Sequence, residues 1–173
     1  MVNVGIVGAT GYTGAELVRI FLGHPGVRLV GLTSRTYKGQ PYSSVYPHLA
    51  EYVEHHCEEL DLDKLVEKSD VVFTALPHGH AMAVARAVVD RGKKLIDLGA
   101  DFRLTDGGVY EQWYKVPHTE REILAAAVYG LPEVNRAKIA GAQLVANPGC
   151  YPTASILALA PALKAGLVDK RSI

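Results

Sequence analysis

The residue with the clearest capacity for covalent chemistry is Cys150, because a helix is expected to begin beside it. Its segment, Asn147-Pro148-Gly149-Cys150-Tyr151-Pro152-Thr153, joins an apolar run, Gln143 to Ala146, to a helix-like run, Ala154 to Leu163. The first N–H groups of a helix are unpaired and form the positive end of its dipole, which favours a thiolate over a thiol. A proline and a glycine before the cysteine bend the chain out of a strand, and a later proline suits the first helical turn. We therefore predict that Cys150 is a nucleophile; the alternative is an ordinary packing cysteine.

A glycine-rich turn near the N-terminus is suited to bind phosphate groups. Val2 to Val7 is short, β-branched and apolar, Ala15 to Leu22 has helical composition, and Gly8-Ala9-Thr10-Gly11-Tyr12-Thr13-Gly14 stands between them. Glycines at such a turn let backbone N–H groups approach a pyrophosphate at the helix N-terminus. The spacing is Gly-x-x-Gly-x-x-Gly, so the prediction depends on its place between a first strand and a helix. The segment predicts a dinucleotide site.

The end of the second predicted strand, Val27 to Thr33, indicates which dinucleotide binds. In this kind of site an acidic residue about 20 residues beyond the glycines holds the ribose of NAD, whereas an arginine accommodates the 2′-phosphate of NADP. The residues at this place are Ser34, Arg35 and Thr36. We therefore predict NADP as the cofactor; the alternative is that Arg35 is a solvated loop residue.

Two further predicted strands, Val71 to Leu76 and Lys94 to Leu98, end in loops that carry polar residues. The first loop is Pro77-His78-Gly79-His80, whose histidines lack the nearby acidic or thiol partners that a metal site would need. We expect this loop to line the cofactor crevice. The second loop contains Asp101 and Arg103, and the fork of an arginine suits a phosphate or carboxylate. Substrate binding by Arg103 and a structural role as a loop anchor are both open.

The alternation of strands and helices predicts an α/β fold, a doubly wound, mostly parallel Rossmann-type sheet. In such sheets ligands bind outside the carboxyl ends of the strands. Leu167 to Ile173 could begin a further strand. The residues expected to contact the cofactor are Gly8, Thr10, Gly11, Tyr12, Thr13, Gly14, Ser34, Arg35, Thr36, Pro77 and His78.

The composition describes a globular chain without bulk charge. Of its 173 residues, 49% are hydrophobic and 21% are charged, which allows a substantial core. Lysine plus arginine equals aspartate plus glutamate at 18 each, so the overall charge does not favour a nucleic-acid or membrane partner. There is no run long enough to span a bilayer and no signal-peptide pattern, and two cysteines make no disulfide framework. We expect a cytoplasmic protein with a small-molecule partner and no metal.

Taken together, the motifs resemble those of the N-acetyl-gamma-glutamyl-phosphate reductase family over essentially the whole chain. The resemblance rests on several segments in the same order rather than on the glycine loop alone. They are Gly8 to Gly14, Thr33-Ser34-Arg35, Tyr46-Pro47-His48-Leu49, Ala75-Leu76-Pro77-His78-Gly79, Asp97-Leu98-Gly99-Ala100-Asp101-Phe102-Arg103, Tyr129-Gly130-Leu131-Pro132-Glu133 and Asn147 to Thr153.

The resemblance implies an NADPH-dependent reduction of an acyl phosphate, N-acetyl-glutamyl phosphate, to a semialdehyde in arginine biosynthesis, with Cys150 as the nucleophile. Family members continue into an α/β substrate domain that carries a histidine acid/base, and none of the seven histidines here matches it. We therefore expect a Rossmann domain at 1–149, with 150–173 as the nucleophile-bearing helix and the start of a truncated substrate domain. The complete protein is expected to be a homo-oligomer. Two alternatives are an NADP-binding module without catalysis and the N-acetyl-aminoadipyl-phosphate reductase of lysine biosynthesis.

Overall fold

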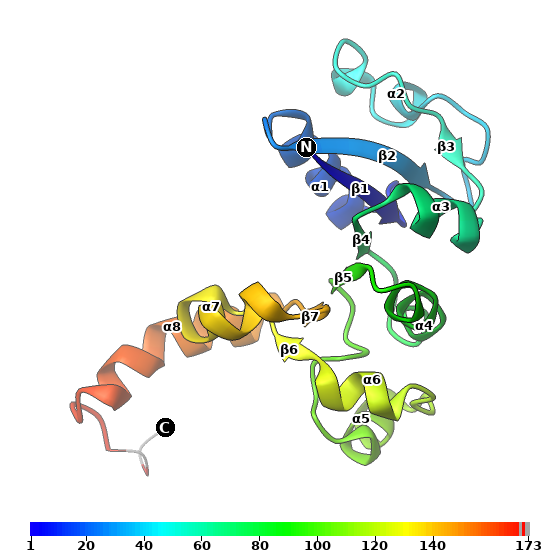
Figure 1. Cartoon of the computed structure of the whole chain (residues 1–173). Helices are drawn as coiled ribbons and strands as arrows, with labels where there is room; N and C mark the ends of the chain where they lie inside the picture. The colour runs from blue at the N-terminus through cyan, green and yellow to red at the C-terminus, as the bar shows by residue number, and fades with distance from the viewer. Residues whose placement is uncertain (170, 172–173) are drawn as a thin grey trace.

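A seven-stranded parallel sheet forms the centre of the molecule (Figure 1). The structure is a computed structural model that describes residues 1–169 and 171. The strands lie in the order β3-β2-β1-β4-β5-β7-β6, and every strand pair within the described residues is parallel. The predicted doubly wound Rossmann-type fold is therefore confirmed. The strands are β1 (Val2–Val7), β2 (Val27–Thr33), β3 (Cys57–Glu58), β4 (Val71–Thr74), β5 (Lys94–Asp97), β6 (Val128–Tyr129) and β7 (Leu144–Ala146).

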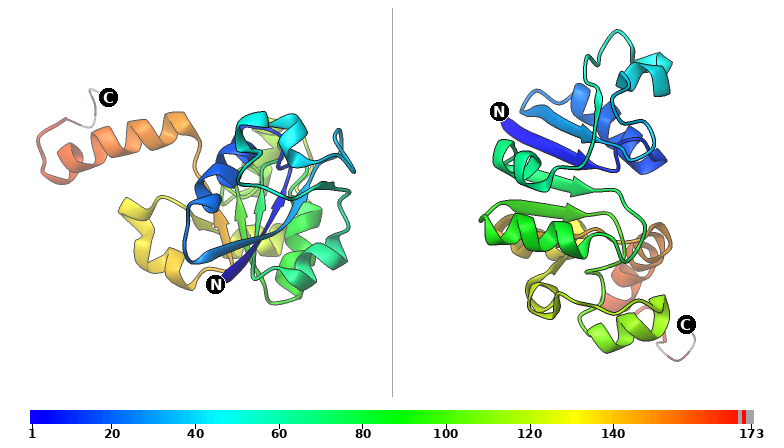
Figure 2. Two further views of the ribbon diagram at one scale, coloured as in Figure 1. Left: turned by 90° about the horizontal axis from the view of Figure 1, so that it is seen from above. Right: turned by 90° about the vertical axis from the view of Figure 1, so that its right-hand side faces the viewer.

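Helices cover both faces of this sheet (Figure 2). One apolar core lies between the sheet and α3, α4, α5 and α6 and includes Leu65, Val88 and Tyr110. The other lies between the sheet and α1 and α2 and includes Val18 and Tyr42. Burial on both faces explains why Val4 to Val7 of β1 and Leu29 to Leu32 of β2 carry no polar side chain. The helices are α1 (Tyr12–Leu22), α2 (Tyr42–Val45), the 3₁₀ helix η1 (Pro47–Leu49), α3 (Leu62–Lys68), α4 (Met82–Asp90), α5 (Gly107–Tyr114), α6 (Arg121–Ala126), α7 (Pro132–Gly141) and α8 (Cys150–Lys164).

The order of the strands places the candidate functional segments at one edge of the sheet. From β1 the chain builds β2 and β3 on one side, and then crosses to β4, β5, β7 and β6 on the other. The point where the order reverses lies between β1 and β4, and such a point opens a crevice beyond the carboxyl ends of the strands. Because all the strands are parallel, the loops that follow β1, β2, β4, β5 and β7 meet at this edge.

Several element boundaries differ from those that the sequence predicts. Strands β3 and β6 were not predicted, because runs of two residues carry no alternation or length that marks a strand. α7 begins at Pro132, and proline is compatible with the first helical turn. For the strand expected from Leu167 to Ile173, 170, 172 and 173 lie outside the described residues, and 167–169 are not in a strand.

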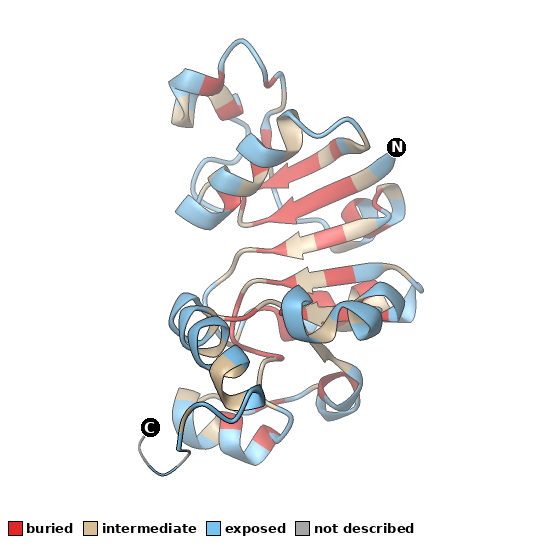
Figure 3. Ribbon diagram, turned by 90° about the vertical axis from the view of Figure 1, so that its left-hand side faces the viewer, coloured by how far each residue is buried: buried red, intermediate tan, exposed pale blue. Residues whose placement is uncertain are grey.

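Helix α8 stands apart from the rest of the molecule. Figures 1 and 2 show it leaving the end of β7 and projecting away from the sheet. None of its residues is buried, whereas the buried residues follow the strands of the sheet (Figure 3). The domain boundary expected at 149/150 stays a prediction. Among the described residues, no helix combines the length and apolar character needed to cross a bilayer.

Candidate active site

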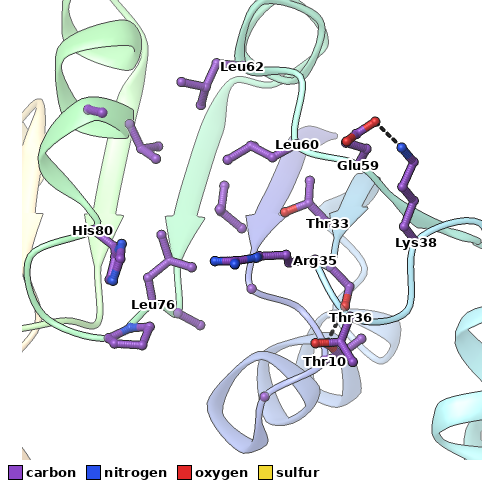
Figure 4. Close-up of a pocket in the computed structure, with 18 residues that line it drawn as sticks. Thr10, Thr33, Arg35, Thr36, Lys38, Glu59, Leu60, Leu62, Leu76 and His80 are labelled. Atoms are coloured by element: carbon purple, nitrogen blue, oxygen red, sulfur yellow. Dashed lines mark hydrogen bonds and ion pairs between the residues drawn. The ribbon is translucent and has the colours of Figure 1, made fainter.

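A pocket of about 790 Å³ lies at the carboxyl ends of β1, β2 and β4 (Figure 4). The loops after these three strands and the first turn of α4 supply most of its wall. Its lining residues combine backbone from the glycine turn, hydroxyl groups, apolar side chains and a few charges. The polar and charged members of the lining are Thr10, Thr33, Ser34, Arg35, Thr36, Lys38, Glu59 and His80.

The glycine turn has the geometry of a phosphate cradle. Gly8 has a φ of +84°, and a Cβ there would lie 2.5 Å from the carbonyl oxygen of Ala75, so only glycine fits. Gly11 differs, because its φ is −77° and the nearest heavy atom to an added Cβ would be 3.8 Å away. The fold therefore leaves open space beside Gly11, at the start of α1. No side chain caps this helix, and its first N–H groups suit an anion.

Two tyrosines to which the sequence assigns no role, Tyr42 and Tyr46, hold the backbone of the glycine turn. The Tyr42 hydroxyl donates to the carbonyl oxygen of Ala9 at 2.8 Å, and the Tyr46 hydroxyl donates to that of Thr10 at 2.8 Å. Burial raises the pKa of Tyr42 far above its ordinary value, so its hydroxyl stays a donor. Tyr46 stands in one of the motifs that carry the family resemblance, but the sequence does not indicate its contact with Thr10, 36 residues away.

The segment after β2 contains Ser34, whose hydroxyl is hydrogen-bonded, and Arg35, whose guanidinium forms no ion pair with the described residues. The Ser34 side chain is buried. Its hydroxyl oxygen lies 2.7 Å from that of Thr10 and accepts a hydrogen bond from the Tyr37 N–H at 3.2 Å. Arg35 is exposed, and none of the salt bridges among residues 1–169 and 171 involves it. Figure 4 shows its side chain extending across the pocket toward Leu76. This guanidinium is available to an anionic ligand.

The loop after β4 is anchored by Asp101, which is fully buried. One carboxylate oxygen accepts from the Gly79 N–H at 2.6 Å and the Tyr110 hydroxyl at 2.8 Å, and the other accepts from the Ala81 N–H at 2.9 Å. Ala81 is the N-cap residue of α4 and provides no side-chain cap of its own. Asp101 therefore serves as a loop anchor, which was one of the two roles left open for this loop.

Only part of the predicted cofactor set lines the pocket. Gly14 is buried, and a Cβ there would lie 2.3 Å from the carbonyl oxygen of Gly8, so it packs the turn against α1. The centroids of the His78 and Tyr114 rings are 5.4 Å apart, so His78 packs against Tyr114. His80 lines the pocket instead. The predicted residues that line it are Gly8, Thr10, Gly11, Ser34, Arg35, Thr36 and Pro77; those that do not are Tyr12, Thr13, Gly14 and His78.

Cys150 is the first residue of α8, and its side chain is exposed. The helix therefore begins at the cysteine, as the proline and glycine of its segment predict. Neighbouring strands are about 4.8 Å apart, so β7 lies about 14 Å along the sheet edge from β1. Cys150 does not line the pocket, but it follows a strand at the same edge. The other cysteine, Cys57, is buried, and burial raises the pKa of its thiol.

Arg103 connects the ends of β5 and β7 beneath the cysteine loop. Its Nε donates to the carbonyl oxygen of Asn147 at 2.7 Å, and its Nη2 donates to that of Leu98 at 2.7 Å. A Cβ at Gly149 would lie 3.2 Å from Nη1, so a glycine lets the chain pass close to the guanidinium. Two of the guanidinium nitrogens therefore hold the loop that carries Cys150.

Asp97 ends β5 beneath the same edge and is fully buried. Its Oδ1 accepts from the Thr74 hydroxyl at 2.7 Å and the Gly99 N–H at 2.9 Å, whereas Oδ2 has no hydrogen-bond partner among the described residues. Burial raises the pKa of this carboxyl group. Its contacts are internal, which favours a structural role over contact with a ligand.

Comparisons with known proteins agree with this geometry. Residues 3–142 match the family model of the semialdehyde dehydrogenase NAD-binding domain. Over all 173 residues the chain is 66% identical to the N-acetyl-gamma-glutamyl-phosphate reductase of Desulforudis audaxviator and 55% identical to that of Moorella thermoacetica. It spans about half the length of these curated relatives, 50% of each.

A solved structure has a similar fold. The aspartate semialdehyde dehydrogenase with NADP from Candida albicans superposes with a TM-score of 0.71 over 97% of this chain and 48% of that protein. The two sequences are 16% identical, so this likeness concerns the fold alone.

Proposed function

Since this chain belongs to the semialdehyde dehydrogenase family and matches its NAD-binding domain, we propose that it is the cofactor-binding part of an NADPH-dependent acyl-phosphate reductase. The proposed reaction converts N-acetyl-glutamyl phosphate to N-acetyl-glutamate semialdehyde and phosphate, a step of arginine biosynthesis. The relatives named N-acetyl-gamma-glutamyl-phosphate reductase support this substrate. The observation that carries the proposal is the exposed thiol of Cys150 at a helix start, on the sheet edge that holds the pocket.

We propose NADP rather than NAD as the cofactor. The family model supports a nicotinamide dinucleotide, and the open space beside Gly11 fits the approach of a pyrophosphate. The choice of NADP is supported by Arg35, an exposed guanidinium at the end of β2 with no ion-pair partner in the described part of the chain. An arginine at this place suits a 2′-phosphate.

In the proposed mechanism Cys150 performs the covalent step. Its thiolate attacks the acyl carbon, a C–S bond forms, the C–O bond to phosphate breaks, and phosphate leaves with the electron pair. The start of α8, which has no side-chain cap, directs N–H groups toward the oxygen that gains charge. When bound, the cofactor supplies the hydride that reduces the thioester, and release of the aldehyde returns the thiolate to Cys150. Arg103 acts as a positioning residue for the cysteine loop, and its Nη1 is the part suited to contact substrate.

The test replaces the thiol without removing its cofactor site. Cys150→Ser in the full-length protein is expected to lower phosphate-dependent turnover by at least about a thousandfold, while the Kd for NADPH stays within about twofold. Steady-state kinetics and calorimetric titration measure the two quantities. Cys57→Ala is the matched control, because Cys57 is buried away from the pocket lining, and it should retain turnover. Normal turnover by Cys150→Ser would refute the proposal.

A second candidate is that this chain binds NADP without catalysing a reaction. The family model ends at residue 142, before the cysteine, which favours a binding module for the matched part. The same kinetic test separates the two, since a module would bind NADPH and show no turnover that depends on Cys150. We also propose a cytoplasmic location, because a reactive thiol persists in a reducing compartment.

A further inference from the structure

A charged pair lies on the rim of the pocket, and the backbone holds its two residues together. The segment after β2 turns over β3 and returns, with Gly39 at a φ of +79°. Three backbone hydrogen bonds fasten it: Ser34 N–H to the Glu58 carbonyl oxygen at 2.9 Å, Gly39 N–H to that of Cys57 at 2.7 Å, and Cys57 N–H to that of Gln40 at 2.8 Å. This fixed turn places Lys38 beside Glu59.

Lys38 Nζ forms an ion pair with the Glu59 carboxylate (Figure 4). Both residues line the pocket, together with Arg35. Glu59 supplies the one carboxylate among the described lining residues. A phosphate monoester carries nearly two negative charges at neutral pH, so a ligand phosphate near Arg35 would be repelled by an unscreened Glu59.

We propose that the Lys38–Glu59 ion pair sets the preference for a 2′-phosphorylated nicotinamide cofactor over an unphosphorylated one. Lys38 acts by neutralising Glu59 rather than by binding the phosphate itself. The inference rests on the proposed function, which brings a 2′-phosphate to the end of β2. A dinucleotide without that phosphate carries no extra charge at this rim, so its affinity does not depend on the pair.

A neighbouring pair offers a matched control. Lys68 Nζ donates to both carboxylate oxygens of Glu58, at 3.1 Å and 2.9 Å, and this pair also stands at the end of β3. Neither residue lines the pocket. Lys68→Met therefore removes the same charge from the neighbouring carboxylate, Glu58, without exposing a carboxylate to the ligand.

The test measures Kd for NADPH and NADH by calorimetry at low ionic strength, using the full chain. Lys38→Met is expected to raise the Kd for NADPH about tenfold and to leave the Kd for NADH within about twofold of its original value. Lys68→Met should change both Kd values by less than about twofold. Glu59→Gln should lower the Kd for NADPH by up to about threefold. The double variant Lys38→Met/Glu59→Gln should return to within about threefold of the unchanged chain.

Several results would overturn the inference. If Lys38→Met leaves the NADPH affinity unchanged, or if Lys68→Met lowers it equally, the Lys38–Glu59 ion pair does not determine the cofactor preference. A double variant as weak as Lys38→Met would mean that Lys38 binds the phosphate directly. Arg35→Ala serves as the reference for the proposed function: if it weakens NADPH and NADH equally, or if the unchanged chain does not bind NADPH, the choice of NADP fails and this inference with it. NADPH binding that depends on Arg35 but not on Lys38 overturns this inference alone.

Discussion

At the scale of single residues, the two cysteines have opposite environments. Cys150 is exposed at the first position of α8, whereas Cys57 is 1% exposed, lies in the core under α2, and has a thiol pKa raised by burial. Attack by a thiol requires both access and the thiolate form. The contrast gives the chain an internal control for the reactivity of Cys150.

We expect iodoacetamide at pH 7 to alkylate Cys150 at least about a hundredfold faster than Cys57 in the folded chain. Mass spectrometry of labelled peptides over time measures both rates. In denaturant the two rates should converge, because burial and the helix are then lost. If Cys150 reacts no faster in the folded than in the denatured chain, the helix start gives it no activation.

At the scale of elements, helices are capped in two different ways. α5 is capped locally, since Asp106 immediately before it accepts from the N–H groups of Gly108 and Val109. α4 has no side-chain cap of its own, and the N–H of its N-cap residue, Ala81, donates to Asp101, 20 residues away in the loop after β5. This distant carboxylate also holds Gly79, so it ties the loop after β4 to the start of α4.

Asp101→Ala should therefore lower the free energy of unfolding by about 3 kcal/mol, because it removes the acceptor of the buried Ala81 N–H and Tyr110 hydroxyl and of the part-buried Gly79 N–H. Asp106→Ala is the matched control, and loss of its exposed local cap should cost about 1 kcal/mol. Chemical denaturation followed by circular dichroism measures both. Equal effects would show that the distant carboxylate contributes no more than an ordinary cap.

At the scale of the whole molecule, α8 stands out among the described helices as an apolar helix that buries none of its residues. Its 15 residues include one charged side chain, Lys164, yet none of them is buried. A helix that is apolar all round is normally enclosed by other elements. Tyr151, Leu157 and Leu159 are among the exposed large apolar residues of the chain.

We expect this chain to self-associate in solution through α8, since exposed apolar surface favours association. Light scattering after size exclusion should show a mass that rises with concentration. Leu157→Gln with Leu159→Gln should shift the chain toward monomer, whereas Ile20→Gln, an exposed apolar residue of α1, should not. A monomer at all concentrations would contradict this expectation.

The sequence by itself determined the elements whose signals are local. The apolar run of β1 and the glycines after it depend on residues a few positions apart. The parallel sheet followed from the alternation of strands and helices. Glycine spacing and a proline-flanked cysteine likewise indicated the turn after β1 and the start of α8.

Tertiary structure alone decided how distant residues share the site. Tyr46 reaches Thr10, Asp101 reaches Ala81, and Glu59 meets Lys38, because strand order brings together loops that are separated in the chain. β3 exists through its pairing with β2, although two residues have no strand pattern of their own. A local pattern fixes backbone conformation within a few residues, whereas the partner of a side chain depends on which strand ends become neighbours.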